Sequence, residues 1–259
     1  MGYLKNKKGI VMGVANDHSI AWGIAQKLSD EGAELCFTYQ GDSLLRRVKP
    51  LAESINNDFL IECDVLRKES IENTFKKIKE KWKNIDFVLH SIAFSDREEL
   101  KGKYIKTSRE NFTQTMLISC FSFTEIANEA HKIMPNGGAM LTLTYDGSQK
   151  YIPNYNVMGV AKAALESSVR YIAADLGDLG IRVNALSAGP MKTLAMAGIS
   201  GGKDMMKWSE KNSLMSRNIS LDDVGKSGLY LLSDLSSGVT GEVHYVDCGY
   251  NKVGVPKEI

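Results

Sequence analysis

The sequence predicts an α/β protein in which helices cover both faces of one doubly wound parallel sheet. Seven short apolar, β-branched segments recur along the 259 residues, and the stretches between them carry helical periodicity. Strand, helix and strand in alternation form a parallel sheet, because each crossover returns over the sheet with one hand. No linker rich in Pro, Gly or Ser divides the chain, so we expect a single domain over residues 1–259.

The expected strands are short segments in which β-branched and other apolar residues predominate. They lie at residues 9–14, 33–39, 59–65, 85–93, 139–145, 181–187 and 242–247. In the first connection, Ile20, Ile24 and Leu28 lie four residues apart and form the apolar stripe of a helix. The lysine-rich run at 76–83 falls late in another expected helix, with Glu80 among the lysines, so we interpret it as a solvated helix face.

Charge and composition limit the partners of the protein. The chain has 32 Lys and Arg against 31 Asp and Glu, a formal net charge of +1, which gives no electrostatic reason to expect nucleic acid or an acidic membrane surface. No apolar run approaches the roughly 18 residues of a membrane helix, and the N-terminal segment lacks a signal-peptide cleavage site, so we expect a cytoplasmic protein. The 4 Cys and 4 His residues show no metal-ligand spacing, so we expect buried free thiols and no metal.

The first strand-to-helix turn, GVANDHSIAWG at residues 13–23, is where open parallel sheets usually bind a pyrophosphate. It lacks the three-glycine spacing of the usual dinucleotide fingerprint. Gly13 still permits close backbone approach, and Ser19 can place a hydroxyl and an amide at the start of a helix whose free N–H groups attract phosphate. We expect Gly23 to leave room for packing of this helix against the strand. A plain turn capped by Ser19 is the alternative.

The tips of the second and third strands are the expected positions of the adenosine half of a dinucleotide. A carboxylate at the second tip would bind the ribose 2′-hydroxyl and repel a 2′-phosphate, but Gln40 stands there. The choice between NADH and NADPH therefore stays open on chemistry alone. Asp64 and Val65 close the third strand, where a hydrogen bond to the adenine amine is expected, and Asp64 can equally cap a helix that begins near Arg67.

The segment YDGSQKYIPNYNVMGVAK at residues 145–162 contains three tyrosines ahead of one lysine. Pro153 favours a helix that begins nearby, which leaves Tyr151 outside the helix, on the lid side or the surface. Tyr145 comes at the end of the fifth strand, where side chains reach the expected cleft, so we expect it to be a substrate contact.

Tyr155 and Lys162 are seven residues apart. At about 100° per residue they return to within about 20° of the same direction, two turns apart on one helix face. We expect both side chains to line the cleft, with Tyr155 as the leading acid or oxyanion donor. The alternative is a packed tyrosine and a solvated lysine.

Several stretches together resemble the short-chain dehydrogenase/reductase superfamily and, within it, the bacterial NAD(P)H-dependent enoyl-acyl-carrier-protein reductases. They run almost from end to end: GVANDHSIAWGIA, CDV, HSIAF, the segment at 145–162, RVNALSAGPMKTLAMAGI and VTGEVHYVDCGYN. Ketone and alcohol members of the superfamily carry a Tyr with three residues before the Lys, a position held here by Met158. The six residues between Tyr155 and Lys162 are the enoyl-reductase spacing. The resemblance implies a Rossmann-like fold.

The resemblance also implies an activity: reduction of the double bond of a trans-2-enoyl thioester on acyl carrier protein in fatty-acid elongation. NADH, or NADPH, would donate hydride to the β-carbon. Tyr155 would stabilise the resulting enolate as a hydrogen-bond donor. Lys162 would hold the nicotinamide ribose and, through its ammonium charge, lower the pKa of Tyr155. A homotetramer is implied as well.

The residues assigned to the site, some from their own chemistry and some through the resemblance, form three sets. The catalytic set is Tyr155, Lys162 and Tyr145. The cofactor set is Gly13, Ser19, Ile20, Gln40, Asp64, Val65, Ser91, Ile92, Ala93, Lys162 and Thr193. The substrate set is Phe94, Tyr145, Met158, Ala195, Met196 and Ile199.

The segment near 191–210 is rich in Ala, Met and Gly, and we expect it to form a lid over the acyl chain. A plain amphipathic helix is the alternative, and the GISGG interruption argues against it. For Phe94 the alternative is core packing.

Two other functions remain as alternatives. A carbonyl reductase of the same superfamily, acting on 3-oxoacyl thioesters or other ketones, is disfavoured by Met158. A non-catalytic NAD(P)-sensing protein is disfavoured by the shared helix face of Tyr155 and Lys162, although a fold alone does not guarantee activity.

Overall fold

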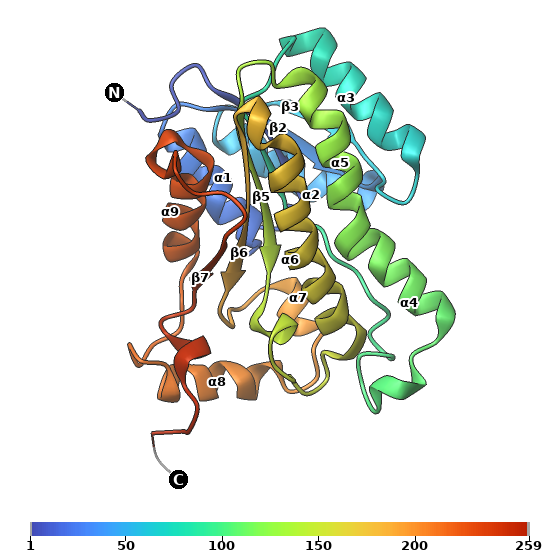
Figure 1. Ribbon diagram of the computed structural model, residues 1–259, viewed down its shortest axis with the longest axis vertical. Coiled ribbons are helices and arrows are strands. Elements are labelled where there is room, and N and C mark those ends of the chain that lie inside the picture. Colours follow the sequence, from blue (N-terminus) through green and yellow to red (C-terminus); the bar gives the residue numbers. More distant parts are fainter. Residues whose placement is uncertain (1, 258–259) are drawn as a thin grey trace.

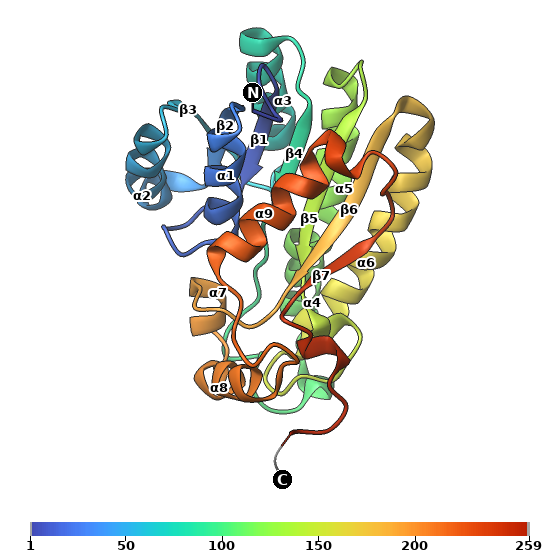
Figure 2. The ribbon, with the colours of Figure 1, turned by 90° about the vertical axis from the view of Figure 1, so that its left-hand side faces the viewer.

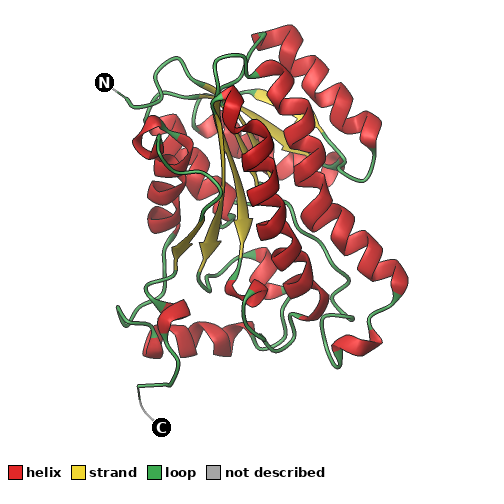
Figure 3. Cartoon of the chain, viewed as in Figure 1, coloured by secondary structure: helices red, strands yellow, loops and turns green. Residues whose placement is uncertain are grey.

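Seven strands form one sheet in the computed structural model, which describes residues 2–257 apart from the side chain of Ala195. The strands are β1 (Lys8–Met12), β2 (Glu34–Tyr39), β3 (Phe59–Glu62), β4 (Phe87–His90), β5 (Gly138–Thr144), β6 (Ile181–Ala188) and β7 (Val243–Val246). Their order is β3-β2-β1-β4-β5-β6-β7, and every neighbouring pair is parallel. The predicted Rossmann-like, doubly wound sheet is confirmed, and each predicted strand segment overlaps an observed strand (Figure 3).

Helices cover both faces of this sheet (Figures 1 and 2). One face carries α1 (Ile20–Asp30), α2 (Gly41–Ser54) and α9 (Leu221–Leu232), and the other carries α3 (Lys68–Trp82), α4 (Arg109–Met116), α5 (Ser122–Ala130) and α6 (Asn156–Leu176). The helices α7 (Leu194–Ala197) and α8 (Gly202–Asn212) lie beyond the carboxyl ends of the strands, where the arrowheads point in Figure 1.

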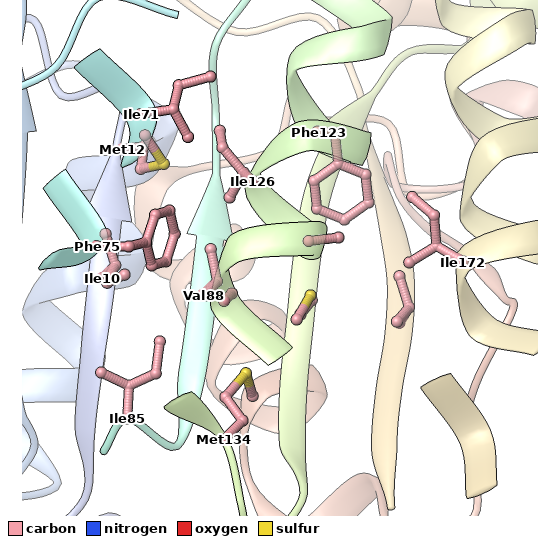
Figure 4. Packing of buried hydrophobic residues seen from close by; sticks show 14 of the residues in the cluster. Ile10, Met12, Ile71, Phe75, Ile85, Val88, Phe123, Ile126, Met134 and Ile172 are labelled. Atoms are coloured by element: carbon pink, nitrogen blue, oxygen red, sulfur yellow. The ribbon is translucent and has the colours of Figure 1, made fainter. Parts of the chain in front are cut away.

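Side chains of successive strand residues point to opposite faces, so each strand contributes to two cores. Ile10 and Met12 of β1 belong to the core beneath α3, α5 and α6, whereas Val11 belongs to the core beneath α1 and α9. Figure 4 shows the first core, in which Val88 of β4 and Ile126 of α5 lie with Ile10 and Met12. Burial on both faces explains why the strand segments are continuous apolar runs in the sequence.

The strand order reverses between β1 and β4, because the chain moves outward from β1 to β3 and then returns to the other side of β1. In open α/β sheets the ligand binds in the crevice at such a switch point. Gly13, directly after β1, has a φ of +96°, and a Cβ there would lie 1.9 Å from the carbonyl oxygen of Ser91. Glycine is required at position 13 because the backbone after β1 and the backbone after β4 lie too close together for a side chain.

The packing of α1 differs from the prediction at Gly23. A Cβ on Gly23 would lie 2.9 Å from the carbonyl oxygen of Leu221, and a Cβ on Gly225 would lie 2.6 Å from the carbonyl oxygen of Gly23. Gly23 therefore lets α1 pack closely against α9, not against a strand. The predicted partner was wrong because α9 follows about 200 residues later in the chain, and no local pattern indicates that it covers α1.

Three smaller predictions concern the surface and the thiols. The lysine-rich run at 76–83 lies in the C-terminal half of α3 and just beyond it, with its lysines exposed as predicted. All four cysteines are buried and free, also as predicted. Among residues 2–257, none of the helices combines the length and the apolar character that a membrane span requires.

Candidate active site

A cavity of about 730 Å³ opens at the carboxyl ends of the central strands. Its walls come from the segments that follow β1, β4, β5 and β6, together with the start of α6 and with α7. Most of the predicted site residues line this one cavity: Gly13, Ser19, Ile20, Ser91, Ile92, Ala93, Phe94, Tyr145, Tyr155, Met158, Lys162, Thr193, Met196 and Ile199. The fold thus brings together, at the switch point, side chains that are widely separated in the sequence.

Ser19 is the N-cap residue of α1, but its side chain stabilises the turn after β1. Its hydroxyl oxygen accepts hydrogen bonds from the backbone N–H groups of Ala15 and Asn16, at 3.0 and 3.1 Å. The described structure contains no bond from its side chain to the first turn of α1. The alternative of a turn capped by Ser19 therefore holds for the position and backbone of Ser19, but its side chain forms no capping hydrogen bond. Its side chain leaves the first N–H groups of α1 available, an arrangement suited to phosphate.

Two polar side chains hold the segment after β4. Ser119, in the π-helical turn Leu117–Phe121, accepts a hydrogen bond from the Phe94 N–H at 3.0 Å and donates one to the Phe94 carbonyl oxygen at 3.1 Å. Asn111 of α4 accepts a hydrogen bond from the backbone N–H of Asp96 at 2.9 Å. The Phe94 side chain is 47% exposed and lines the cavity, so the alternative of core packing is wrong.

Tyr155 lies directly before α6, not inside it. Its buried ring packs edge to face on the Tyr145 ring, with the two centroids 5.3 Å apart. The Tyr155 hydroxyl forms no hydrogen bond with any residue that the structure describes, and the residue lines the cavity. Burial raises the pKa of Tyr155, and the negative charge of Glu166 acts in the same direction. The phenol therefore stays protonated at neutral pH and can donate a hydrogen bond.

Lys162 is buried in α6 and donates a hydrogen bond from Nζ to the Leu143 carbonyl oxygen at 2.8 Å. Burial lowers the pKa of Lys162 to about 8. The predicted lowering of the Tyr155 pKa is wrong, because the cost of removing a phenolate from water outweighs any attraction to this ammonium group. Tyr155 and Lys162 share the cavity wall as their spacing predicts, although no hydrogen bond joins them among the described contacts.

Glu166 lies one turn after Lys162 on α6 and holds the end of β5. Its buried carboxylate accepts a hydrogen bond from the Thr144 hydroxyl at 2.6 Å, another from the Ser148 hydroxyl, and a third from Nε2 of Gln149 at 2.7 Å. With Lys162 bound to the backbone just before Thr144, α6 contacts the end of β5 at two successive turns. Charge-assisted bonds of this kind are about twice as strong as neutral ones.

Tyr145 lies inside the segment that Glu166 holds. It lines the cavity, and its hydroxyl is buried near Tyr250. Burial raises the pKa of Tyr145, and the nearby Tyr250 adds to this effect. Tyr151, by contrast, is 85% exposed, which confirms its predicted place at the surface.

The segment near 191–210 folds as two helices, α7 and α8, joined by a turn in which Gly201 has a φ of +82°. The predicted interruption of helical structure at GISGG is confirmed. The part of the segment that precedes Ser200 lines the cavity through Met191, Thr193, Leu194, Met196, Gly198 and Ile199. Asn154 donates a hydrogen bond from Nδ2 to the Ser200 carbonyl oxygen at 2.9 Å. The side chain of Ala195, predicted to contact substrate, lies outside the described part of the structure.

Three predicted cofactor residues do not line this cavity. Gln40 is exposed at the start of α2, and Asp64 and Val65 follow β3. Asp64 accepts a hydrogen bond on Oδ1 from the Leu66 N–H at 3.0 Å, whereas Arg67 is the N-cap of α3, so the alternative of an Asp64 N-cap is wrong. These residues lie outside the cavity because β2 and β3 are on the side of β1 away from β4.

The described residues contain no group of three or more side chains that could hold a metal ion. His90, the histidine nearest the site in sequence, is fully buried in β4. Its Nδ1 lies 3.0 Å from the Thr142 hydroxyl oxygen and its Nε2 lies 2.9 Å from that of Ser122. Burial lowers the pKa of His90 to about 3, so this ring is a neutral structural group.

Glu166, Ser119 and Asn111 were missed in the sequence. Glu166 follows Lys162 by four residues, the spacing that places two side chains on one helix face, so a usable signal was present. Ser119 and Asn111 act on the backbone of a segment 25 and 15 residues away. Contacts over such distances leave no periodic pattern in a single sequence.

This combination of switch-point cavity, free helix start and paired tyrosine and lysine places the protein in the short-chain dehydrogenase/reductase class, whose members are dinucleotide-dependent oxidoreductases. Comparison with known proteins narrows the class. A family described as Enoyl-(Acyl carrier protein) reductase matches residues 13–251. The chain belongs to this family.

Individual relatives agree with this assignment. Enoyl-[acyl-carrier-protein] reductase [NADH] 2 of Rhizobium meliloti is 61% identical, over 98% of this chain and 95% of the relative. The crystal structure of FabI from Candidatus Liberibacter asiaticus has a TM-score of 0.97 and 59% identity, covering 99% of this chain and 100% of that one. The structure of an enoyl-(acyl-carrier-protein) reductase from Anaplasma phagocytophilum, solved in complex with NAD, has a TM-score of 0.96 and 53% identity. The match covers 99% of this chain and 98% of that one.

Proposed function

We propose that this protein reduces trans-2-enoyl-acyl-carrier-protein to the saturated acyl-acyl-carrier-protein, with NADH as the reductant, in fatty-acid biosynthesis. The observation that carries this function is the free, protonated Tyr155 hydroxyl on the wall of a cavity that joins the turn after β1 to an apolar pocket. Membership of the enoyl-(acyl carrier protein) reductase family supports the same reaction.

The residues after β1 fit a dinucleotide. The start of α1, with Ser19 turned back into its own loop, offers backbone N–H groups to a diphosphate. Lys162 would hold the nicotinamide ribose, and Thr193 and the 91–93 segment would border the nicotinamide. Gln40, Asp64 and Val65 would meet the adenosine half beyond the cavity.

The apolar end of the cavity fits the acyl chain of the substrate. Phe94, Met158, Met196 and Ile199 line it, and the helices α7 and α8 would form the lid. Tyr145 would contact the substrate next to Tyr155. The thioester carbonyl would lie at the Tyr155 hydroxyl.

The reaction requires a donor for a developing negative charge. When bound, NADH supplies a hydride to the β-carbon of the enoyl thioester. Tyr155 donates a hydrogen bond to the thioester oxygen, where the charge develops, and one such donor contributes about 2.7 to 4 kcal/mol of transition-state stabilisation. The raised pKa of Tyr155 keeps its proton in place while the enolate forms. The α-carbon of the enolate then takes a proton from solvent water, which completes the saturated acyl thioester. Lys162 acts by position, because its ammonium group is held at the Leu143 carbonyl oxygen.

The test is oxidation of NADH, followed at 340 nm, with crotonyl thioester and with acetoacetyl thioester. We expect turnover with the crotonyl compound and at most a trace with the acetoacetyl compound. Faster turnover of acetoacetyl thioester would instead identify a carbonyl reductase. NADH binding without turnover of either compound would indicate a non-catalytic protein.

We also propose a homotetramer in the cytoplasm. Apolar side chains lie exposed on the neighbouring outer faces of α4, the π-helical turn and α6: Phe112, Leu117, Phe121, Val160 and Tyr171. The second surface of this proposal is the half-buried edge strand β7 with α9, since two self-complementary surfaces are needed to build a closed tetramer. The four free thiols suit a reducing compartment. Light scattering should give four times 28.6 kDa, and Phe121→Asp should lower the mass.

A further inference from the structure

The Glu166 side chain bonds to the end of β5 and to the connection that follows it. Its carboxylate is 2% exposed and receives three hydrogen bonds, all from residues 144–149. No other residue is described as bonding to this carboxylate. A buried carboxylate with three donors to one segment fixes that segment strongly, since each lost bond would leave a buried polar group unsatisfied.

The segment that Glu166 fixes is the surface on which the Tyr155 ring rests. Tyr145 packs edge to face on that ring. The backbone at Gly147 lies so close that an added Cβ would be 2.6 Å from Cδ1 and 2.8 Å from Cε1 of Tyr155. α6 presses on the same place, because a Cβ on Gly159 would lie 2.7 Å from the Gly147 carbonyl oxygen. Glu166, the segment and the Tyr155 ring therefore form one chain of contacts.

We propose that Glu166 is a positioning residue for the enoyl reduction: it fixes residues 144–149, and these residues hold the Tyr155 ring so that its hydroxyl reaches the substrate oxygen. This inference rests on the proposed function. Glu166 itself lies outside the cavity lining, so it acts through Tyr155 and not on the substrate. Its charge supports the same role, because it raises the pKa of Tyr155 and keeps the phenol in the donor form.

A double-mutant cycle with Tyr155→Phe tests this role. Glu166→Ala removes all three hydrogen bonds, and we expect kcat to fall by about 10- to 100-fold, the cost of a catalytic group misplaced by about 1 Å. In a Tyr155→Phe background there is no hydroxyl left to misplace. Glu166→Ala should then change kcat by less than about twofold, since coupled residues are not additive. NADH affinity, measured by fluorescence, should stay within about twofold in the single variant.

Rescue by a close analogue separates position from charge. Glu166→Gln keeps an amide oxygen for the Thr144 and Ser148 hydroxyls, and the Gln149 amide can turn its oxygen to the new N–H group. We expect kcat within about threefold of the wild type for this variant. Gln149→Ala removes only one hydrogen bond, so it carries the test if Glu166→Ala fails to fold. Glu129→Ala is the matched control, because Glu129 is a mostly buried carboxylate on α5 that bonds to Asn128 and Lys132 away from the cavity.

The outcomes separate the two proposals. If the wild type does not oxidise NADH with crotonyl thioester, the proposed function fails. If the wild type is active but Glu166→Ala, folded, lowers kcat equally with and without the Tyr155 hydroxyl, only the positioning role is overturned. An unchanged kcat in folded Glu166→Ala overturns it as well.

Discussion

Gly147 lies against the Tyr155 ring, and a single added methyl group there tests the geometry of the site. In Gly147→Ala the new Cβ would be 2.6 Å from Cδ1 of Tyr155, whereas ordinary contacts begin at 3.4 Å, so the ring has to retreat by about 0.8 Å. Gly147 has no positive φ, so alanine fits the backbone and only the contact with the ring changes.

A displacement of this size is enough to lower the rate. A catalytic group misplaced by about 1 Å costs roughly 100-fold in rate, and overpacking of this kind costs about 1–3 kcal/mol of stability. We therefore expect kcat of Gly147→Ala with crotonyl thioester to fall by about 100-fold, whereas NADH affinity stays near that of the wild type. The three atoms nearest to the added Cβ belong to Tyr155 and Ile152, so we expect Lys162 and the turn after β1 to keep their places.

Steady-state kinetics at 340 nm, NADH fluorescence and urea denaturation check the three expectations. Gly177→Ala is the matched control, because no atom lies within 4 Å of a Cβ built there and its φ of −60° is helical. This control should keep the activity and gain slightly in stability. A folded Gly147→Ala protein with wild-type kcat would refute the placement of Tyr155 as the donor.

Three further predictions concern the cavity. Tyr155→Phe should lower kcat by about 10²- to 10³-fold with NADH affinity nearly intact, whereas Lys162→Ala should weaken NADH binding. An equal loss of NADH binding by both variants in fluorescence titrations would contradict these separate roles. Because burial lowers the pKa of Lys162 to about 8 from 10.5, the unfolded state binds more protons between these values and stability rises with pH there. Relative to Lys162→Met, the free energy of unfolding of the wild type, measured in urea, should rise on the order of 3 kcal/mol between pH 7 and pH 10.5. A difference in unfolding free energy that stays constant with pH would count against a buried ammonium group. Phe94→Ala should raise KM for the enoyl thioester several-fold. It should cost under about 1.5 kcal/mol of stability, since the ring is half exposed. An unchanged KM would show that Phe94 does not contact the substrate.

The predictions that held depend on short-range patterns. The strands were visible because burial on both faces makes each one a continuous apolar run. Tyr155 and Lys162 meet at one cavity because seven residues are two helical turns, even though Tyr155 itself lies just before α6. The break between α7 and α8 was visible in the glycines of GISGG.

What the sequence left open or placed wrongly concerns which groups contact one another. Gly23 marks a close approach, but only the fold shows that α9 is the partner. Ser19 has the chemistry of a helix cap, yet its hydroxyl bonds to the turn before it. Phe94 is apolar, but its exposure depends on Ser119, which holds its backbone at the cavity wall.

The amino-acid sequence by itself determined the alternation of strands and helices, the doubly wound parallel sheet and the pair of side chains expected to act together. These follow from periodicity and from the geometry of a parallel sheet, which need no knowledge of distant contacts. Only the tertiary structure decided that Tyr155 keeps its proton, that Lys162 binds a backbone carbonyl group, and that Glu166 holds the segment beneath the Tyr155 ring. The reason is that a pKa and a hydrogen bond depend on burial and on distances between atoms, and these exist only once remote segments have packed together.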